Sequence, residues 1–103
     1  MSEFLLEREG PKVKVMVGPL LTAQTAPELR ELLCAIQEDG VTDLALDFSG
    51  TETLDAAGIA LLLSAANSYR GGGKHLSVLS VPRGIYSLLE TMRVAQRLNA
   101  QIG

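Results

Sequence analysis

The chain has 103 residues, of which 47% are hydrophobic and 20% are charged, and its formal net charge is −3. This length predicts one domain, residues 1–103, and the composition predicts one apolar core rather than a disordered chain. Nine Lys and Arg residues, two Tyr and two Phe offer neither a basic face nor a platform for stacked bases. Nucleic acid is therefore excluded as an expected partner.

The sequence also predicts the compartment. Cys34 is the single cysteine, so no disulfide can form within the chain, which fits a reducing compartment. Met1 is not followed by a basic stretch and an apolar run, so we expect no signal peptide. No apolar run approaches the roughly 20 residues that cross a bilayer. We therefore expect a cytoplasmic protein with no direct membrane insertion.

Two strands are expected first, at residues 4–9 and 12–17, joined at Gly10 and Pro11 as an antiparallel hairpin. In the second strand, three valines alternate with Lys and Met residues, which is the period-two pattern of a half-buried strand. The first helix is expected to begin after Thr25 and to end near Gly40, which suits a C-terminal cap.

That first helix carries two clear signals. Thr25 and Glu28 match a capping box, in which the two side chains bind backbone N–H groups reciprocally. Apolar residues then recur at the spacing that gives a helix one buried stripe. The stripe comprises Leu29, Leu32, Leu33 and Ile36. Cys34 lies beside it, and we interpret this side chain as packing rather than chemistry.

The second half of the chain alternates strands and helices. A third strand is expected at residues 43–48, followed by a polar loop at 49–53. A second helix is expected at 56–69, with Asp55 as its N-cap, and a fourth strand at 76–80. A third helix is expected after Pro82, with a stripe of Ile85, Leu88, Leu89 and Met92. The remaining residues, 94–103, are expected to form a short last helix and a frayed end.

This order of elements predicts an α/β fold: a mixed sheet of four to five strands with helices mainly on one face. Crossovers through helices require parallel pairing, whereas the opening hairpin is antiparallel. The expected buried residues are apolar positions of the helices and central strands: Leu29, Leu32, Leu33, Ile36, Leu44, Leu46, Ile59, Leu62, Leu63, Leu88 and Leu89.

Residues that catalyse reactions are scarce. His75 is the single histidine, and we interpret it as a solvated surface residue. Lys74 follows three glycines, but the hydroxyl residue and the strand-to-helix order of a phosphate-binding loop are missing. Asp43 and Asp47 share a strand face at a Cα separation of about 13 Å, too far to share a proton. We therefore expect no enzyme activity, no cofactor and no metal site.

The second helix has an unusual distribution of residues. One stripe is apolar and should face the sheet: Ile59, Leu62, Leu63, Ala66 and Tyr69. The other side carries no charge: Ala57, Ala60, Leu61, Ser64, Ala65 and Ser68. Surface helices normally place charged residues there. Two explanations stay open: a neighbouring element covers this side, or a partner docks on it.

Several segments resemble the STAS family. An aliphatic strand ends in Asp47, and after a short loop the sequence Asp55-Ala56-Ala57-Gly58-Ile59 opens a helix, similar to the family's Asp-Ser-[Ser/Thr]-Gly-Leu segment. The first-helix region and the passage from the last strand to the last helix also resemble the family, at Gly18 with Leu20 or Leu21, Thr25 to Leu29, Val81-Pro82 and Leu88-Leu89. Together these segments span nearly the whole chain.

This resemblance implies a function. A separate STAS domain of this length is similar to bacterial anti-sigma factor antagonists, which take part in partner switching during transcription regulation. Such an antagonist binds a kinase-like anti-sigma factor and is switched off when the kinase phosphorylates the Ser after the Asp. The resemblance therefore implies a signal-transduction partner bound through the loop and the start of the second helix. The expected partner-binding residues are Asp55, Ala56, Ala57, Gly58, Ala60, Leu61 and Ser64.

The chain departs from the family at the phosphoacceptor. That Ser falls on Ala56, and the next hydroxyl position falls on Ala57, so neither can accept a phosphate. Asp55 matches and is expected to cap the helix, and Gly58 matches and is expected to keep the first turn open to approach. Two alternatives remain: an accessory subunit that binds the ATPase of a lipid ABC transporter, or an adaptor in a sensory or chemosensory complex. A homo-oligomer is compatible with all three.

Overall fold

The computed structural model describes residues 4–103; the first three residues, part of the segment for which no signal peptide is expected, lie outside the described range. Seven strands and three helices follow one another in this part of the chain. Their order is β1 (Leu5–Glu9), β2 (Lys12–Met16), β3 (Leu20–Leu21), α1 (Ala26–Glu38), β4 (Asp43–Asp47), β5 (Thr53–Leu54), α2 (Ala56–Gly71), β6 (His75–Val81), α3 (Arg83–Thr91) and β7 (Ala100–Ile102).

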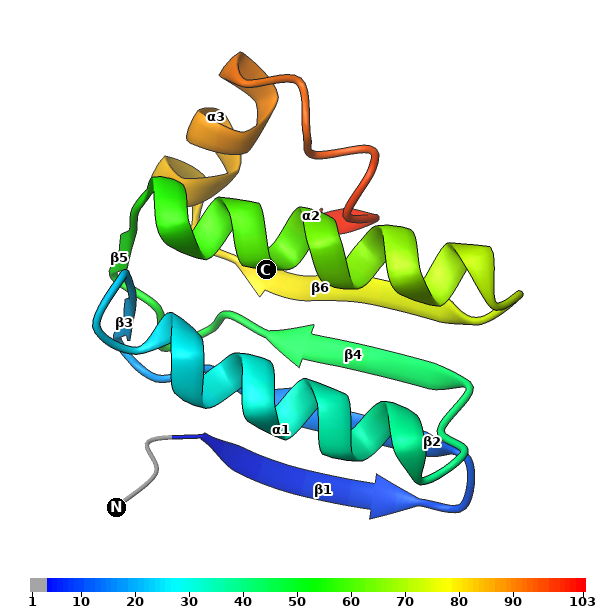
Figure 1. Ribbon diagram of the computed structural model, residues 1–103. Helices are drawn as coiled ribbons and strands as arrows, with labels where there is room; N and C mark the ends of the chain where they lie inside the picture. The colour runs from blue at the N-terminus through cyan, green and yellow to red at the C-terminus, as the bar shows by residue number, and fades with distance from the viewer. Residues whose placement is uncertain (1–3) are drawn as a thin grey trace.

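Five strands form the main sheet in the order β1-β2-β4-β6-β7, and β3 and β5 form a separate parallel pair. The β1–β2 hairpin is antiparallel, and the other pairs are parallel. Helices α1 and α2 lie side by side over one face of the sheet, and α3 extends from the end of β6 (Figure 1). The predicted mixed sheet with helices mainly on one face is confirmed.

The core lies between the sheet and the helices, and it follows from the alternation in the strands. Alternate strand residues are buried on the helix side: Val13, Val15, Leu44, Leu46, Leu76 and Val78. The buried stripes of the helices pack against these strand residues: Leu29, Leu33, Ile36, Ile59, Leu62 and Leu89. Leu32 and Leu63 are only half-buried at the margin of this core. The structure therefore confirms most of the predicted core.

The stripe predicted for the third helix is only half right. Ile85 and Leu89 are buried, but Leu88 is 38% exposed and Met92 is 46% exposed. The helix has nine residues and stands at the end of β6, so one narrow side of it reaches the core. Cys34 is also exposed, contrary to the expectation that it packs beside the stripe of the first helix.

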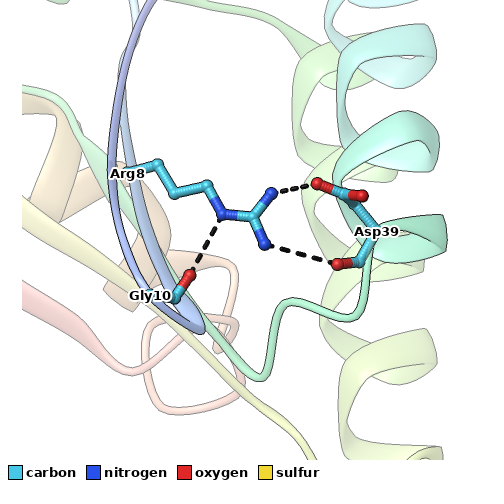
Figure 2. Close-up of polar contacts among 3 residues, drawn as sticks. All are labelled: Arg8, Gly10 and Asp39. Carbon is cyan, nitrogen blue, oxygen red and sulfur yellow. Dashed lines mark hydrogen bonds and ion pairs between the residues drawn. The ribbon is translucent and has the colours of Figure 1, made fainter.

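Arg8 fastens the hairpin to the end of α1. Its Nη1 donates to the Asp39 carboxylate, its Nη2 to the Asp39 carbonyl oxygen (3.4 Å), and its Nε to the Gly10 carbonyl oxygen (3.0 Å) (Figure 2). Asp39 is the C-cap of α1, so the guanidinium also lies where the helix dipole favours a cation. Gly40 follows with φ of +78°, a conformation that suits glycine at this position.

The capping box predicted at Thr25 does not form. The Thr25 hydroxyl accepts from Thr22 N–H (3.0 Å) and donates to the Leu20 carbonyl oxygen (3.0 Å), so it stabilises the turn before the helix. Thr25 has helical rather than extended backbone angles, and its side chain makes no cap hydrogen bond. The capping box does not form because the Thr25 hydroxyl is already used in the hydrogen bonds of this turn.

The end of the chain also differs from the expectation of a helix. Residues 95–99 form turns, and β7 pairs in parallel with β6. The register shifts between Val78 and Val81, and Ser80 within this stretch has φ of 54°. Asn99 Nδ2 donates to the Leu76 carbonyl oxygen (2.9 Å) and fixes the approach of the last strand. No helix within residues 4–103 is long and apolar enough to span a bilayer.

Candidate protein-interaction site

Asp55 joins two segments at the start of α2. Its Oδ1 accepts from Gly58 N–H (3.0 Å), as an N-cap should, and its Oδ2 accepts from Ala23 N–H (3.0 Å). Its own N–H donates to the Leu21 carbonyl oxygen (3.2 Å). The predicted cap is confirmed, and the same carboxylate also holds the loop before α1 against the first turn of α2.

The electrostatics of Asp55 follow from these contacts. Hydrogen bonds from the backbone N–H groups of Gly58 and then Ala23 hold the pKa of the Asp55 carboxyl below its ordinary value. Both donors favour the charged form, and the helix N-terminus favours a negative charge as well. Asp55 is therefore ionised at neutral pH, and each of its carboxylate oxygens accepts a hydrogen bond from the backbone.

The loop between β4 and β5 is held firmly. Thr51 is buried, and its hydroxyl donates to the Gly18 carbonyl oxygen (3.1 Å). The N–H groups of Glu52 and Thr53 both donate to the Pro19 carbonyl oxygen, at 2.8 and 3.0 Å. Three consecutive residues of this loop are thus hydrogen-bonded to the β2–β3 segment, and this connection supports the start of α2.

Asp47 anchors the other end of this loop. It accepts from Ser49 N–H (2.8 Å) and forms an ion pair with Lys14 (3.3 Å). Burial acts to raise the pKa of Asp47, but the hydrogen bonds from Ser49 and Lys14 outweigh it, so the pKa lies below its ordinary value. This aspartate ends β4 and fixes the direction in which the loop leaves the sheet.

The first turns of α2 expose small, uncharged side chains. Ala56, Ala60 and Ser64 are exposed, and Ala57 is half-buried. A shallow hollow of about 500 Å³ lies beside them between α1 and α2. It is lined by Ala23, Ala26, Pro27, Arg30, Glu31, Ala57 and Ala60. We call these four residues, Ala56, Ala57, Ala60 and Ser64, the alanine patch.

Two residues predicted for this surface lie inside the protein. Leu61 is 4% exposed, on the side of α2 turned toward α1, where Gln37 also bonds to Ser68. The neighbouring helix therefore explains part of the uncharged side, and a partner is not needed for that part. Gly58 is buried, and a Cβ there would lie 2.5 Å from the Leu21 carbonyl oxygen. Glycine lets β3 approach α2, and it does not open the turn to solvent.

The structure also adds a residue that the sequence did not indicate. Ala23 lies far from α2 in the chain, yet its N–H binds Asp55 and it lines the hollow beside Ala57. No local pattern around Ala23 signals this contact, because it depends on how β3 pairs with β5. Among residues 4–103, no three His, Cys, Asp or Glu side chains are grouped to hold a metal.

Comparisons with known proteins identify the family. Residues 4–100 match the family model described as "Mlab, STAS domain". The chain is 30% identical over 77 residues to an anti-sigma-B factor antagonist of Staphylococcus aureus, which is 75% of this chain and 71% of the relative. It is 27% identical over the same length to the anti-sigma-B factor antagonist of Staphylococcus epidermidis.

Solved structures share the fold. The crystal structure of a putative anti-sigma factor antagonist from Thermotoga maritima has a TM-score of 0.86 and 14% identity, covering 94% of this chain and 84% of that one. The anti-sigma factor antagonist SpoIIAA of Bacillus, in its unphosphorylated form, has a TM-score of 0.83 and 14% identity, covering 97% of this chain and 87% of that one. These likenesses extend over almost all of the α/β architecture.

Proposed function

The chain belongs to the STAS family, and from that premise we propose that it is a protein-interaction module that binds a kinase-like anti-sigma partner through the alanine patch and Asp55. The supporting observation is the exposed, uncharged start of α2 on a rigid base. The curated relatives are anti-sigma-B factor antagonists, which supports the same class of partner. In this proposal the protein regulates by binding and catalyses no reaction.

The alanine patch suits docking because it costs little to bury. An alanine side chain loses no rotamer freedom in an interface, and it carries no polar atom that must be desolvated. Ala56 and Ala60 stand one turn apart on the exposed side of α2. Arg30 and Glu31 lie at the α1 edge of the adjacent hollow, where they provide a polar rim of both charges.

The same patch removes the phosphorylation switch from this position. Ala56 stands directly after the capping Asp55 and has no hydroxyl, and neither does Ala57. Thr51, in the preceding loop, is buried with its hydroxyl engaged, so a kinase cannot reach it without unfolding the loop. We therefore propose that the module stays in its binding-competent form.

The test is to place a negative charge on the patch. Ala56→Asp should weaken binding to the anti-sigma partner about a hundredfold, because a carboxylate would be desolvated without a cation to pair with it. Ala56 is the first residue of α2, where a carboxylate suits the helix dipole, so unfolding is not the expected cause. Calorimetric titration of the partner gives the affinity, and a thermal melt of each variant reports the fold.

Ala35→Asp is the matched control. Ala35 is also an exposed helical alanine, but it lies on α1 and outside the hollow. It should bind the partner like the wild-type protein. Equal affinity of Ala56→Asp and Ala35→Asp, with normal melts for both, would show that the partner docks elsewhere.

A second candidate is an accessory subunit that binds the ATPase of a transporter. The observation that favours it is the absence of a hydroxyl at both Ala56 and Ala57, since a transporter subunit does not need the phosphorylation switch. Wild-type protein and Ala56→Asp titrated against an anti-sigma factor and against a transporter ATPase separate the two. The true partner binds the wild-type protein and loses affinity for the variant.

A further inference from the structure

A basic hollow lies at the opposite end of α2 from the alanine patch. It has a volume of about 260 Å³, and four of its lining residues carry basic side chains: Arg70, Lys74, His75 and Arg97. Ala66, Gly73, Leu76 and Asn99 complete the lining. The end of α2, the start of β6 and the turns before β7 therefore bring together basic groups that are up to 27 residues apart.

No acidic residue lines this hollow. Within residues 4–103, the ion pairs are Arg8–Asp39 and Lys14–Asp47, and neither involves the hollow. Three of the nine Lys and Arg residues of a chain with net charge −3 are thus gathered at one small site without carboxylate partners. Like charges placed together repel, so the site holds a positive potential that an anion would relieve.

Capping of α2 does not account for the cluster. The last carbonyl groups of the helix, at residues 68–70, already accept hydrogen bonds from the N–H groups of Gly72, Gly73 and Lys74. Arg70 is the one basic residue in the last turn of the helix, where the dipole favours a cation. Lys74 and Arg97 lie beyond the helix and are not explained in this way.

The donors are partly fixed in place. Arg70 Nη2 donates to the Arg97 carbonyl oxygen (3.2 Å), which holds this guanidinium against the segment that forms the opposite wall. Asn99 Nδ2 donates to the Leu76 carbonyl oxygen (2.9 Å) and holds that wall to β6. A guanidinium has five N–H donors, so Arg70 keeps several for a ligand.

We infer that this hollow binds the phosphate group of a phosphomonoester. Such a group carries nearly two negative charges at neutral pH and several strong acceptor oxygens, which match two guanidinium groups and an ammonium. The volume suits a phosphate group with a small attached part rather than a folded protein segment. The phosphate can belong to a soluble molecule or to a lipid headgroup, and the site is independent of the proposed docking surface.

Titration of the full chain with glycerol 3-phosphate, followed by amide chemical shifts in NMR, tests the site. Saturable shifts are expected at residues 70–76 and 97–99, whereas sodium chloride at equal ionic strength should give none that saturate. Arg70→Gln combined with Lys74→Gln should weaken binding about tenfold, because two charge-assisted hydrogen bonds are lost. Arg83→Gln, which removes one exposed cation at the start of α3 and outside the hollow, should leave the affinity unchanged.

Vesicles distinguish the two sources of the phosphate. Sedimentation with phosphatidylcholine vesicles that contain phosphatidic acid, but not with pure phosphatidylcholine, would assign the site to a lipid headgroup. Saturable binding of glycerol 3-phosphate without vesicle binding would assign it to a soluble phosphomonoester. Absence of both, equal affinity of the double variant, or tighter binding of an acidic peptide than of glycerol 3-phosphate would overturn the inference. Partner titrations of the double variant should match the wild-type protein.

Discussion

The two ends of α2 differ in how closely they are packed and in how well their polar groups are hydrogen-bonded. At the start, Asp55 uses both carboxylate oxygens, and Gly58 is pressed against the Leu21 carbonyl oxygen with no room for a Cβ. At the end, a Cβ on Gly71 would meet nothing within 4 Å, and the Tyr69 hydroxyl is buried without a hydrogen bond among the described residues. The first end is tightly constrained, whereas the second has space around Gly71 and one buried hydroxyl without a partner among the described residues.

This difference shows which end of α2 has a tightly fixed backbone. The constrained end presents the alanine patch, and a surface that must match a partner benefits from a backbone that does not move on binding. The loose end presents long cationic side chains that can adjust to a small anion. The following predictions test whether the contrast in packing has energetic consequences.

The largest expected effect comes from a matched pair of glycine substitutions. Gly58→Ala should lower the free energy of unfolding by about 2–3 kcal/mol, because β3 must move away from α2 to admit the methyl group. Gly71→Ala should raise it by about 0.5 kcal/mol, because alanine restricts the unfolded chain and meets no obstacle. Urea unfolding measures both, and equal effects would contradict the contrast.

Loss of the double-acceptor cap should come next. Asp55→Ala should lower the melting temperature by roughly 5 °C, and Asp55→Asn should lower it less because one amide oxygen still accepts. The pKa of Asp55 is depressed in the folded protein, so its contribution is present above its ordinary pKa of 3.8 and is lost as the pH falls through the folded value.

Thermal melts of the wild-type protein and of Asp55→Asn at a series of pH values test this direction of the pH dependence. The difference in melting temperature should be constant near neutral pH and should shrink as the pH falls below about 3.8. A difference that grows at low pH would mean that the carboxylate does not stabilise the fold through its charged form.

The last prediction is a second stabilising substitution near the end of α2. Tyr69→Phe should raise the free energy of unfolding by about 1 kcal/mol, because it removes a buried hydroxyl that has no partner. Burial raises the pKa of Tyr69, so the wild-type protein loses stability as the pH rises above 10 while the variant does not. Unfolding at pH 7 and pH 10.5 should therefore show a gap that widens with pH.

The sequence predicts most of this fold because the decisive patterns are local. The spacing of Leu29, Leu33 and Ile36 defines the buried side of α1, and alternation defines the strands. The burial of Leu61 depends instead on contact between two helices that are distant in sequence. The missing capping box at Thr25 results from a turn that competes for its hydroxyl. The strand β7 has three residues and no periodicity, so its pairing with β6 leaves no trace in a local pattern.

The candidate site was only partly predictable for the same reason. The cap at Asp55 is a local motif, and the structure places it where the sequence indicates. The contact from Ala23 and the buried position of Gly58 arise from the β3–β5 pair, two residues on each side, which is too short to be recognised as strands. Exposure of the alanine patch then follows from the way α1 covers one side of α2 and leaves the other free.

The strand order sets a sequence of events for folding. In the five-stranded sheet, β1 and β2 are the neighbouring strands with no helix between them in the chain, so their hairpin can form early, whereas each parallel pair must wait until a helical crossover has closed. The central strand β4 gains its second neighbour, β6, only after α2 has been synthesised. During synthesis, one edge of β4 would therefore stay unpaired for that interval, and an unpaired strand edge is a site at which chains can aggregate.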